Sequence, residues 1–206
     1  MTEYEDQYYL VGKKFNAETL YLSALEKTEN RDYDFDKMIY GEEPLFFENA
    51  YRDKDGERGV VRSLKKVHMN STYLIVDDEI KADMEVFDIN GFQLYPAVII
   101  TDDGVYHDNY WFFNIYEELD ALDCENSVIR DYDLKNRGHE VEKFKLNKEV
   151  LGGIPEENRL VFIMPNTETR VTVVHQKIVN IFERYGVDNI AFHKMSEWYP
   201  GKQFRS

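Results

Sequence analysis

Acidic side chains dominate the middle of the sequence. Between Lys81 and Arg130 there is no lysine or arginine, whereas eleven aspartate and glutamate residues occur, so this region carries most of the formal net charge of −15. Eight of these acids surround one apolar segment: Asp102, Asp103, Asp108, Glu117, Glu118, Asp120, Asp123 and Glu125. A region of one charge sign repels itself and attracts cations, which favours binding of a basic partner over a reaction. A plain solvated surface is the alternative explanation.

A calcium loop is a second possibility, in the segment DYDFDKMIYGEE. Asp32, Asp34 and Asp36 occupy positions 1, 3 and 5 of a calcium-binding loop, and Glu43 occupies position 12. Lys37, however, stands where the sharp turn of such a loop requires glycine. Alternating acids on the solvent side of a short segment explain the pattern better, so we expect no metal site.

The other reactive side chains are scattered. The five histidines are His68, His107, His139, His175 and His193. None of them has a second potential metal ligand at the spacing of a motif such as HExxH. His107 and Asp108 are adjacent, but neighbours in a strand point to opposite faces and share a proton or a metal poorly. Cys124 lies between Asp123 and Glu125, which raise a thiol pKa and disfavour a nucleophilic role. The sequence therefore predicts no catalytic residue and no cofactor.

The acidic residues surround a predicted central hairpin. Two runs rich in aromatic and β-branched residues flank Asp103-Gly104, a dipeptide suited to a two-residue turn with positive φ at both positions. Such a turn predicts these cross-strand pairs: Phe92–Ile115, Leu94–Phe113, Tyr95–Phe112, Pro96–Trp111 and Ala97–Tyr110. Both faces are apolar, so we expect both to be covered. Pro96 has no backbone N–H, which predicts an edge or bulge position.

Apolar patterns predict the remaining elements. We expect strands at residues 8–11, 45–47, from 67, 73–76, 141–146, 160–164 and 189–192. We expect helices over 16–25, from 77 to 89 and over 171–185, and loops at 53–59, 131–140 and 152–158. Residues 119–129 are open between a helix and an extended segment. The predicted fold class is α+β, a mainly antiparallel or mixed sheet built around the long central hairpin with helices packed on it.

Length and composition predict one domain. A chain of 206 residues with 43% hydrophobic content can bury a sizeable core, so we expect a single domain over residues 1–206. A single cysteine rules out an intrachain disulfide and fits a reducing cytoplasm. The N-terminal segment lacks the positive region of a secretory signal, and no run has the roughly 20 apolar residues of a membrane span. The acidic balance disfavours nucleic acid and membrane as partners and leaves the oligomeric state open.

The succession of these patterns resembles a known family. The chain resembles family eleven of the immunity proteins of bacterial polymorphic toxin systems, formerly a domain of unknown function. The resemblance rests on this succession: a strand, a helix with an acidic start, the run FQLYPAVI, the segment YWFFNIYEELDALDCENS, a closing strand and an amphipathic helix. The similarity lies mainly in residues 73–127 and 160–192. It implies a non-enzymatic cytoplasmic protein that binds and neutralises a cognate toxin, often encoded beside it. It identifies no individual binding residue.

Charge and resemblance together give the leading hypothesis. A toxin that attacks nucleic acid must hold phosphates, so an acidic inhibitor can cover its basic surface. We expect such a toxin domain to dock on one acidic face, formed by Asp102, Asp103, Glu117, Glu118, Asp120 and Asp123. An exposed Trp111 or Tyr110 would provide an aromatic anchor. Two alternatives remain, a small-molecule enzyme that uses Asp108 beside His107 as acid or base, and an adaptor within a larger assembly.

Overall fold

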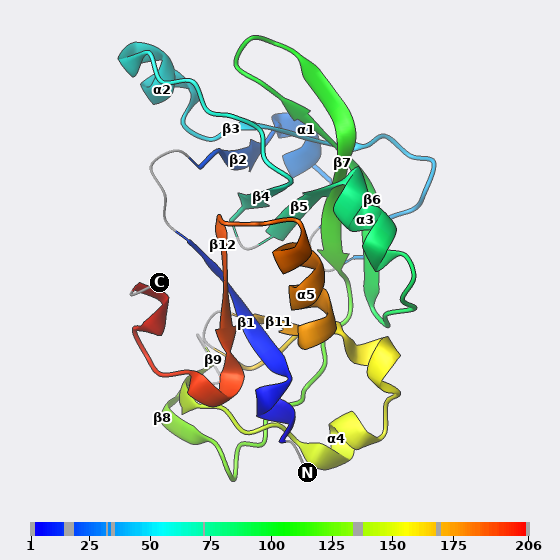
Figure 1. The fold of residues 1–206 in the computed structure, drawn as a ribbon, viewed down its shortest axis with the longest axis vertical. Coiled ribbons are helices and arrows are strands. Elements are labelled where there is room, and N and C mark those ends of the chain that lie inside the picture. Colours follow the sequence, from blue (N-terminus) through cyan, green and yellow to red (C-terminus); the bar gives the residue numbers. More distant parts are fainter. Residues whose placement is uncertain are drawn as a thin grey trace. The chain divides into compact units, whose positions relative to one another are not determined.

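The computed structural model describes residues 3–14, 19–31, 33, 36–71, 73–133, 138–167 and 170–204 (Figure 1). The chain divides into two compact units. Unit 1 comprises Met1–Lys14, Phe87–Gly91 and Glu117–Ser206, and unit 2 comprises Phe15–Val86 and Phe92–Tyr116. Helices and mainly antiparallel sheets occur together, which confirms the α+β class. That residues 1–206 form one domain stays a prediction.

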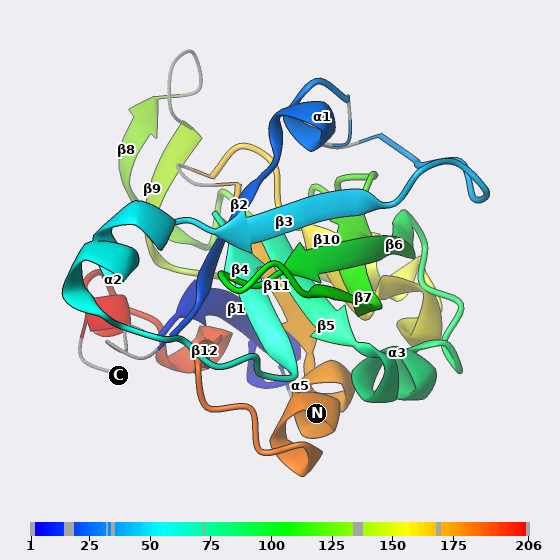
Figure 2. The same cartoon turned by 90° about the horizontal axis from the view of Figure 1, so that it is seen from above.

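Unit 2 is built on a closed six-stranded barrel (Figure 2). Around the barrel the strands follow the order β2 (Tyr21–Ala24), β3 (Leu45–Asn49), β6 (Phe92–Ile100), β7 (Tyr106–Ile115), β5 (Tyr73–Asp77) and β4 (Val67–Asn70). The pairs β2–β4 and β3–β6 are parallel, and the other neighbours are antiparallel. The short helices of this unit are α1 (Glu26–Glu29), α2 (Arg52–Arg58) and α3 (Asp78–Met84). In both views α2 and α3 lie on opposite sides of the barrel.

The central hairpin, β6 and β7, forms with the predicted pairs. The register from Phe92–Ile115 to Ala97–Tyr110 is the one predicted from the sequence. Tyr95 and Phe112 fill the barrel interior, while Leu94 and Phe113 are buried on the other face, so both faces are covered as expected. The ladder between β6 and β3 begins only at Ala97, and Pro96 therefore lies just outside it.

The predicted two-residue turn is wrong. After Ala97 the register shifts, so that Ile99 pairs with His107. This bulge places an extra residue on β7 and moves the pairing by one position. The result is a three-residue loop, in which Gly104 N–H donates to Thr101 O at 2.8 Å and Thr101 N–H donates to Val105 O at 3.0 Å. Only Gly104 has a positive φ, +81°, as in a turn followed by a left-handed glycine.

Unit 1 contains a four-stranded antiparallel sheet. Its strands follow the order β10 (Val161–Ile163), β11 (Thr172–His175), β1 (Tyr8–Lys13) and β12 (Ile190–Lys194). β8 (Val128–Asp133) and β9 (Gly138–Lys143) form a separate pair. The helices are α4 (Lys148–Gly152) and α5 (Gln176–Arg184), with short 3-10 turns at η1 (Tyr4–Asp6), η2 (Glu156–Arg159), η3 (Met195–Glu197) and η4 (Lys202–Phe204). Trp198 packs against the core of this unit, and its indole N–H donates to Val141 O at 3.3 Å.

Several predicted elements before the hairpin are wrong. Residues 21–24 form β2 instead of part of a helix, because Leu20 and Leu22 are buried at alternate positions and pair into the barrel. Residues 16–18 of that predicted helix lie outside the described residues. The segment 53–59, expected to be a turn, belongs to α2 and ends in Gly59 at φ +64°. Helix α3 begins as predicted but ends at Met84, earlier than expected.

Later boundaries also differ from the prediction. The segment 131–140 is not one loop, because β8 extends to Asp133 and β9 starts at Gly138; residues 134–137 lie outside the described part. The expected loop at 152–158 contains the last residue of α4 and most of η2. The last helix starts only at Gln176, since the preceding residues form β11, and its predicted stop at Gly186 is confirmed by a φ of +64°. Residues before β8 are irregular, with an isolated bridge between Leu122 and Leu146.

Candidate binding surfaces

The six acids predicted to form one face are divided between the two units. Asp102 and Asp103 occupy the turn of the β6–β7 hairpin in unit 2, and four belong to unit 1: Glu117, Glu118, Asp120 and Asp123. The ten residues of β7 extend over about 33 Å, so the turn is far from the other end of that strand. The two groups are therefore two candidate surfaces.

Most of the net negative charge belongs to unit 2. Unit 2 contains 20 acidic and 10 basic residues, whereas unit 1 contains 20 acidic and 15 basic residues. The β6–β7 hairpin itself, from Phe92 to Tyr116, has three aspartates and neither lysine nor arginine. A cation approaching unit 2 therefore meets a stronger attractive field than one approaching unit 1.

Asp103 is held within the turn. Its Oδ1 accepts a hydrogen bond from Thr101 Oγ1 at 2.6 Å, and this bond lowers the pKa of the Asp103 carboxyl below its usual value. Its side chain is exposed, and so are the neighbouring Asp102 and Val105. The turn thus presents two carboxylates to solvent.

Asp102 is tied to a buried polar network. Asn49 Nδ2 donates to Asp102 Oδ2 at 3.1 Å and to Asp55 Oδ2 at 3.0 Å. Asp55 in turn accepts two hydrogen bonds from the guanidinium of Arg62, at 2.5 and 2.7 Å. These bonds from Arg62, with that from Asn49, lower the pKa of Asp55 to about 2. The network fixes helix α2, the segment that follows it and the hairpin turn to one another.

A hollow of about 480 Å³ lies beside this network and is called the barrel-end hollow. Its lining residues are Arg52, Asp53, Gly56, Glu57, Gly59, Val60, Val61 and Asp102. Val61 is 93% exposed, the highest value among the large apolar side chains in the described part of the chain. The hollow therefore combines an exposed apolar pair with three carboxylates and one guanidinium.

The acids of unit 1 are partly engaged within that unit. Glu118 forms an ion pair with Arg170 at 2.7 Å. Asp123 accepts hydrogen bonds from the backbone N–H groups of Glu125 and Asn126, and from Asn126 Nδ2 at 2.7 Å. These bonds lower the pKa of the Asp123 carboxyl and close the loop around it. The carboxylates of Glu117 and Asp120 are exposed.

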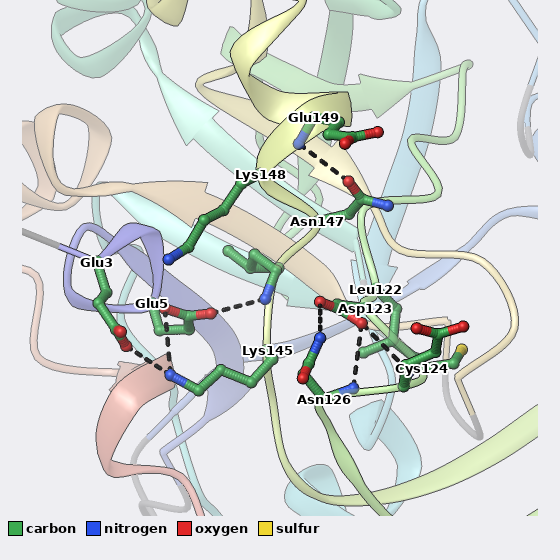
Figure 3. Close-up of a pocket in the computed structure, with 12 residues that line it drawn as sticks. Glu3, Glu5, Leu122, Asp123, Cys124, Asn126, Lys145, Asn147, Lys148 and Glu149 are labelled. Carbon is green, nitrogen blue, oxygen red and sulfur yellow. Dashed lines mark hydrogen bonds and ion pairs between the residues drawn. The ribbon is translucent and has the colours of Figure 1, made fainter.

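A second hollow, of about 710 Å³, lies beside this loop and is called the unit 1 hollow (Figure 3). Lys145 reaches toward two glutamates there, with its Nζ 2.5 Å from Glu3 Oε2 and 3.9 Å from Glu5 Oε2. Glu5 is only 2% exposed, and its Oε1 accepts a hydrogen bond from Leu146 N–H at 2.7 Å. Lys145 thus offsets part of the charge of Glu3 and Glu5, while the lining of this hollow also includes Asp123, Glu125, Glu149 and Lys148.

The residues of the enzyme alternative do not form a catalytic pair. Asp108 is exposed, and His107 is half-buried with its Nε2 3.4 Å from Thr101 Oγ1. Neither residue lines the two hollows described above. Burial and neighbouring acids raise the pKa of the exposed thiol of Cys124, in the direction expected from Asp123. This arrangement offers neither a poised base nor an activated nucleophile at these positions.

The histidines take part in the fold. Nε2 of the fully buried His68 accepts a hydrogen bond from Lys65 N–H at 2.9 Å, and its Nδ1 lies 3.3 Å from Leu20 O. Burial lowers the pKa of His68 to about 4, so the ring is neutral at physiological pH. His175 caps helix α5 by accepting from Lys177 N–H at 3.2 Å. These contacts account for two of the five histidines as structural residues.

The expected aromatic anchors are not free. Tyr110 is 5% exposed and donates its hydroxyl to Lys65 O at 2.9 Å. Trp111 is half-buried, and its indole N–H donates to Asp78 Oδ1 at 2.6 Å. Lys81 Nζ also lies 4.1 Å from the centre of the Trp111 ring. An anchor beside the acidic turn must therefore come from other residues.

Sequence reasoning missed the residues behind the barrel-end hollow. Asp55 lies in the segment 53–59 that was expected to be a turn, whereas Asn49 and Arg62 belong to no predicted element, and no motif spacing connects the three. Val60 and Val61 carried one usable signal, because they are an apolar pair in a polar stretch and fit no predicted core face.

The calcium loop considered above stays untested, because two of its proposed ligands fall on residues that the structure does not describe. Asp32 and Asp34 lie outside the part of the chain that is described, and no group of three or more potential metal ligands is found within that part. No helix in the described ranges is long and apolar enough to cross a membrane.

Comparison with known proteins identifies the family. The search of curated proteins gave no match. The Imm11 immunity protein family matches residues 12–197, which covers nearly the whole chain and both units. This range contains the hairpin, the acidic turn and the two valines of the barrel-end hollow. The chain belongs to the Imm11 immunity protein family.

Proposed function

We propose that this protein binds a cognate toxin domain with a basic surface and neutralises it by covering that surface, without catalysing a reaction. Membership of an immunity protein family supports the toxin as the partner. The acidic hairpin supports a basic surface on the toxin, because this hairpin has no lysine or arginine and belongs to a unit with 20 acidic and 10 basic residues. Such a field accelerates association with a cationic protein and repels nucleic acid and anionic lipid.

The proposed docking residues are Asp102, Asp103, Glu117, Glu118, Asp120 and Asp123. Asp102 and Asp103 are the principal ones, because both are exposed at the tip of the hairpin. Glu118 is secondary, because its ion pair with Arg170 already offsets its charge, whereas Asp102, Asp103 and Asp123 accept hydrogen bonds from neutral donors. A carboxylate with an internal partner gains less from a second cation.

The proposal places the protein in the cytoplasm. Its only cysteine, Cys124, is a free exposed thiol, which suits a reducing compartment. A toxin domain would meet the inhibitor there before it reaches its target.

Charge reversal tests the proposal. The double variant Asp102→Lys/Asp103→Lys is compared with Glu26→Lys/Glu29→Lys, which changes the net charge equally at exposed positions of α1 in the same unit. The probe is a catalytically inactive form of the toxin domain identified among the products of adjacent genes, and association rates are measured at increasing salt. We expect the turn variant to slow association by about tenfold or more and to flatten its salt dependence.

The control variant should lose less, because its charges lie outside the docking surface. Equal losses in the two double variants would show that only net charge matters and would remove the turn from the interface. If the unchanged protein bound the toxin domain tightly and its affinity did not depend on salt, the proposed basic surface of the toxin would be contradicted.

A further inference from the structure

We propose that the barrel-end hollow is the anchor of the toxin interface, where an apolar side chain of the partner packs on Val60 and Val61 while cations beside it meet Asp53, Glu57 and Asp102. This inference rests on the proposed function and goes beyond it, because it names an apolar contact where charge alone predicts none. Tight interfaces concentrate their binding energy in a small central contact that excludes water, surrounded by a polar rim.

The exposure of the two valines is the first support. Val61 is 93% exposed and Val60 is 38% exposed, and both follow directly on helix α2 and line a shallow, open hollow. Water around such side chains is released when another apolar group covers them. Exposed apolar residues ringed by charged ones are typical of a protein interaction site.

The rigidity of their backbone is the second support. Gly59 ends helix α2 at φ +64°, and Val60 N–H donates to Asp55 O at 2.9 Å. On the other side, Arg62 is held by Asp55 and donates to Thr19 O at 3.2 Å. The valines are therefore presented between two fixed points, and a partner need not order this segment when it binds.

Charge complementarity identifies the occupant. The hollow has carboxylates on Asp53, Glu57 and Asp102 against one guanidinium, that of Arg52. Arg52 already pairs with Glu48 at 3.2 Å, so it opposes an incoming cation only weakly. Asp102 is also held in position by Asn49. The surface fits a basic protein with an apolar side chain set among lysines or arginines, and it disfavours an acidic one.

The substitution Val61→Asp separates an apolar anchor from general electrostatic attraction. It adds a negative charge, so a purely electrostatic interface would bind the basic toxin domain more tightly. An apolar anchor predicts the opposite, because a carboxylate would have to lose water against an apolar side chain. The matched control is Val86→Asp, in the same unit and 74% exposed, just after α3 on the side of the barrel away from α2.

Equilibrium titration with the inactive toxin domain encoded beside the gene provides the test. We expect Val61→Asp to raise Kd by about tenfold or more, Val61→Ala to raise it less, and Val86→Asp to leave it within about twofold. Urea unfolding curves that match the unchanged protein confirm that the exposed substitutions leave the fold intact. Unchanged or tighter binding by Val61→Asp would overturn the anchor while leaving the proposed function standing. Failure of the unchanged protein to bind the toxin domain would overturn both.

Discussion

Asn49 is the residue on which the geometry of the acidic turn depends most directly. It is 4% exposed, and its side chain donates to Asp55 and Asp102 and accepts from Tyr51 N–H. The substitution Asn49→Ala removes these three contacts at once. It leaves the ion pair between Asp55 and Arg62 in place.

The expected loss follows from those contacts. The three hydrogen bonds, at 2.9, 3.0 and 3.1 Å, contribute about 1 kcal/mol each, so the free energy of unfolding should fall by about 3 kcal/mol. A larger loss is not expected, because no charge is left isolated: Asp55 keeps Arg62, and Asp102 is exposed to water.

Urea unfolding followed by Trp111 fluorescence measures this loss in unit 2. The sequence has two tryptophans, of which Trp111 belongs to unit 2 and Trp198 to unit 1, so a Trp198→Phe background leaves one reporter. The matched control is Asn109→Ala, at an exposed position of β7, which should change the free energy by less than about 0.5 kcal/mol. A loss below about 1 kcal/mol for Asn49→Ala, or one equal to the control, would refute the network as the framework of the turn.

Three further predictions concern protonation, thiol reactivity and cooperativity. Burial lowers the pKa of His68 from 6.5 to about 4, so as the pH falls below about 6.5 the unfolded chain binds a proton at this residue and the folded protein does not. The free energy of unfolding, measured by urea titration, should therefore drop by about 2 kcal/mol between pH 7 and 5. The substitution His68→Gln should remove most of that drop. Burial and the charges of Asp120 and Asp123 raise the pKa of Cys124, so iodoacetamide should alkylate its thiol at pH 8 more slowly than it alkylates free cysteine. The substitution Asp120→Asn should speed this reaction. An alkylation rate above that of free cysteine would contradict the raised pKa. If residues 1–206 form one cooperative domain, the Trp111→Phe and Trp198→Phe variants should unfold at the same urea concentration, and two separate midpoints would show independent units.

The hairpin was predictable because its determinants are local. The apolar runs on either side of Asp103-Gly104 located the hairpin, but its pairs from Phe92–Ile115 to Ala97–Tyr110 arise by another route, because the three-residue loop shifts the register by one position and the bulge in β7 shifts it back. The bulge was not predicted, although Asp108 and Asn109, which lie on β7 between the two registers, are residue types uncommon in strands. Closure of the barrel was also beyond the sequence, since it depends on parallel pairing of β2 with β4 and of β3 with β6, and such pairs leave no turn signal.

The candidate surface was predictable in its charge and not in its arrangement. Acids that are close in sequence were expected to share one face, yet a ten-residue strand separates the turn from Glu117 and the residues that follow it. Asn49, Asp55 and Arg62 come together only through tertiary contacts. Val61 becomes informative once its exposure is known, because an apolar residue in a polar segment can be buried or displayed.

Protection of cells tests the central claim most directly. The toxin domain encoded beside the gene is induced in cells that contain this protein, its Asp102→Lys/Asp103→Lys variant or neither, and growth is followed. We predict growth with the unchanged protein, arrest without it, and weaker protection by the variant. Arrest despite abundant, folded, unchanged protein would contradict the proposed neutralisation of a cognate toxin.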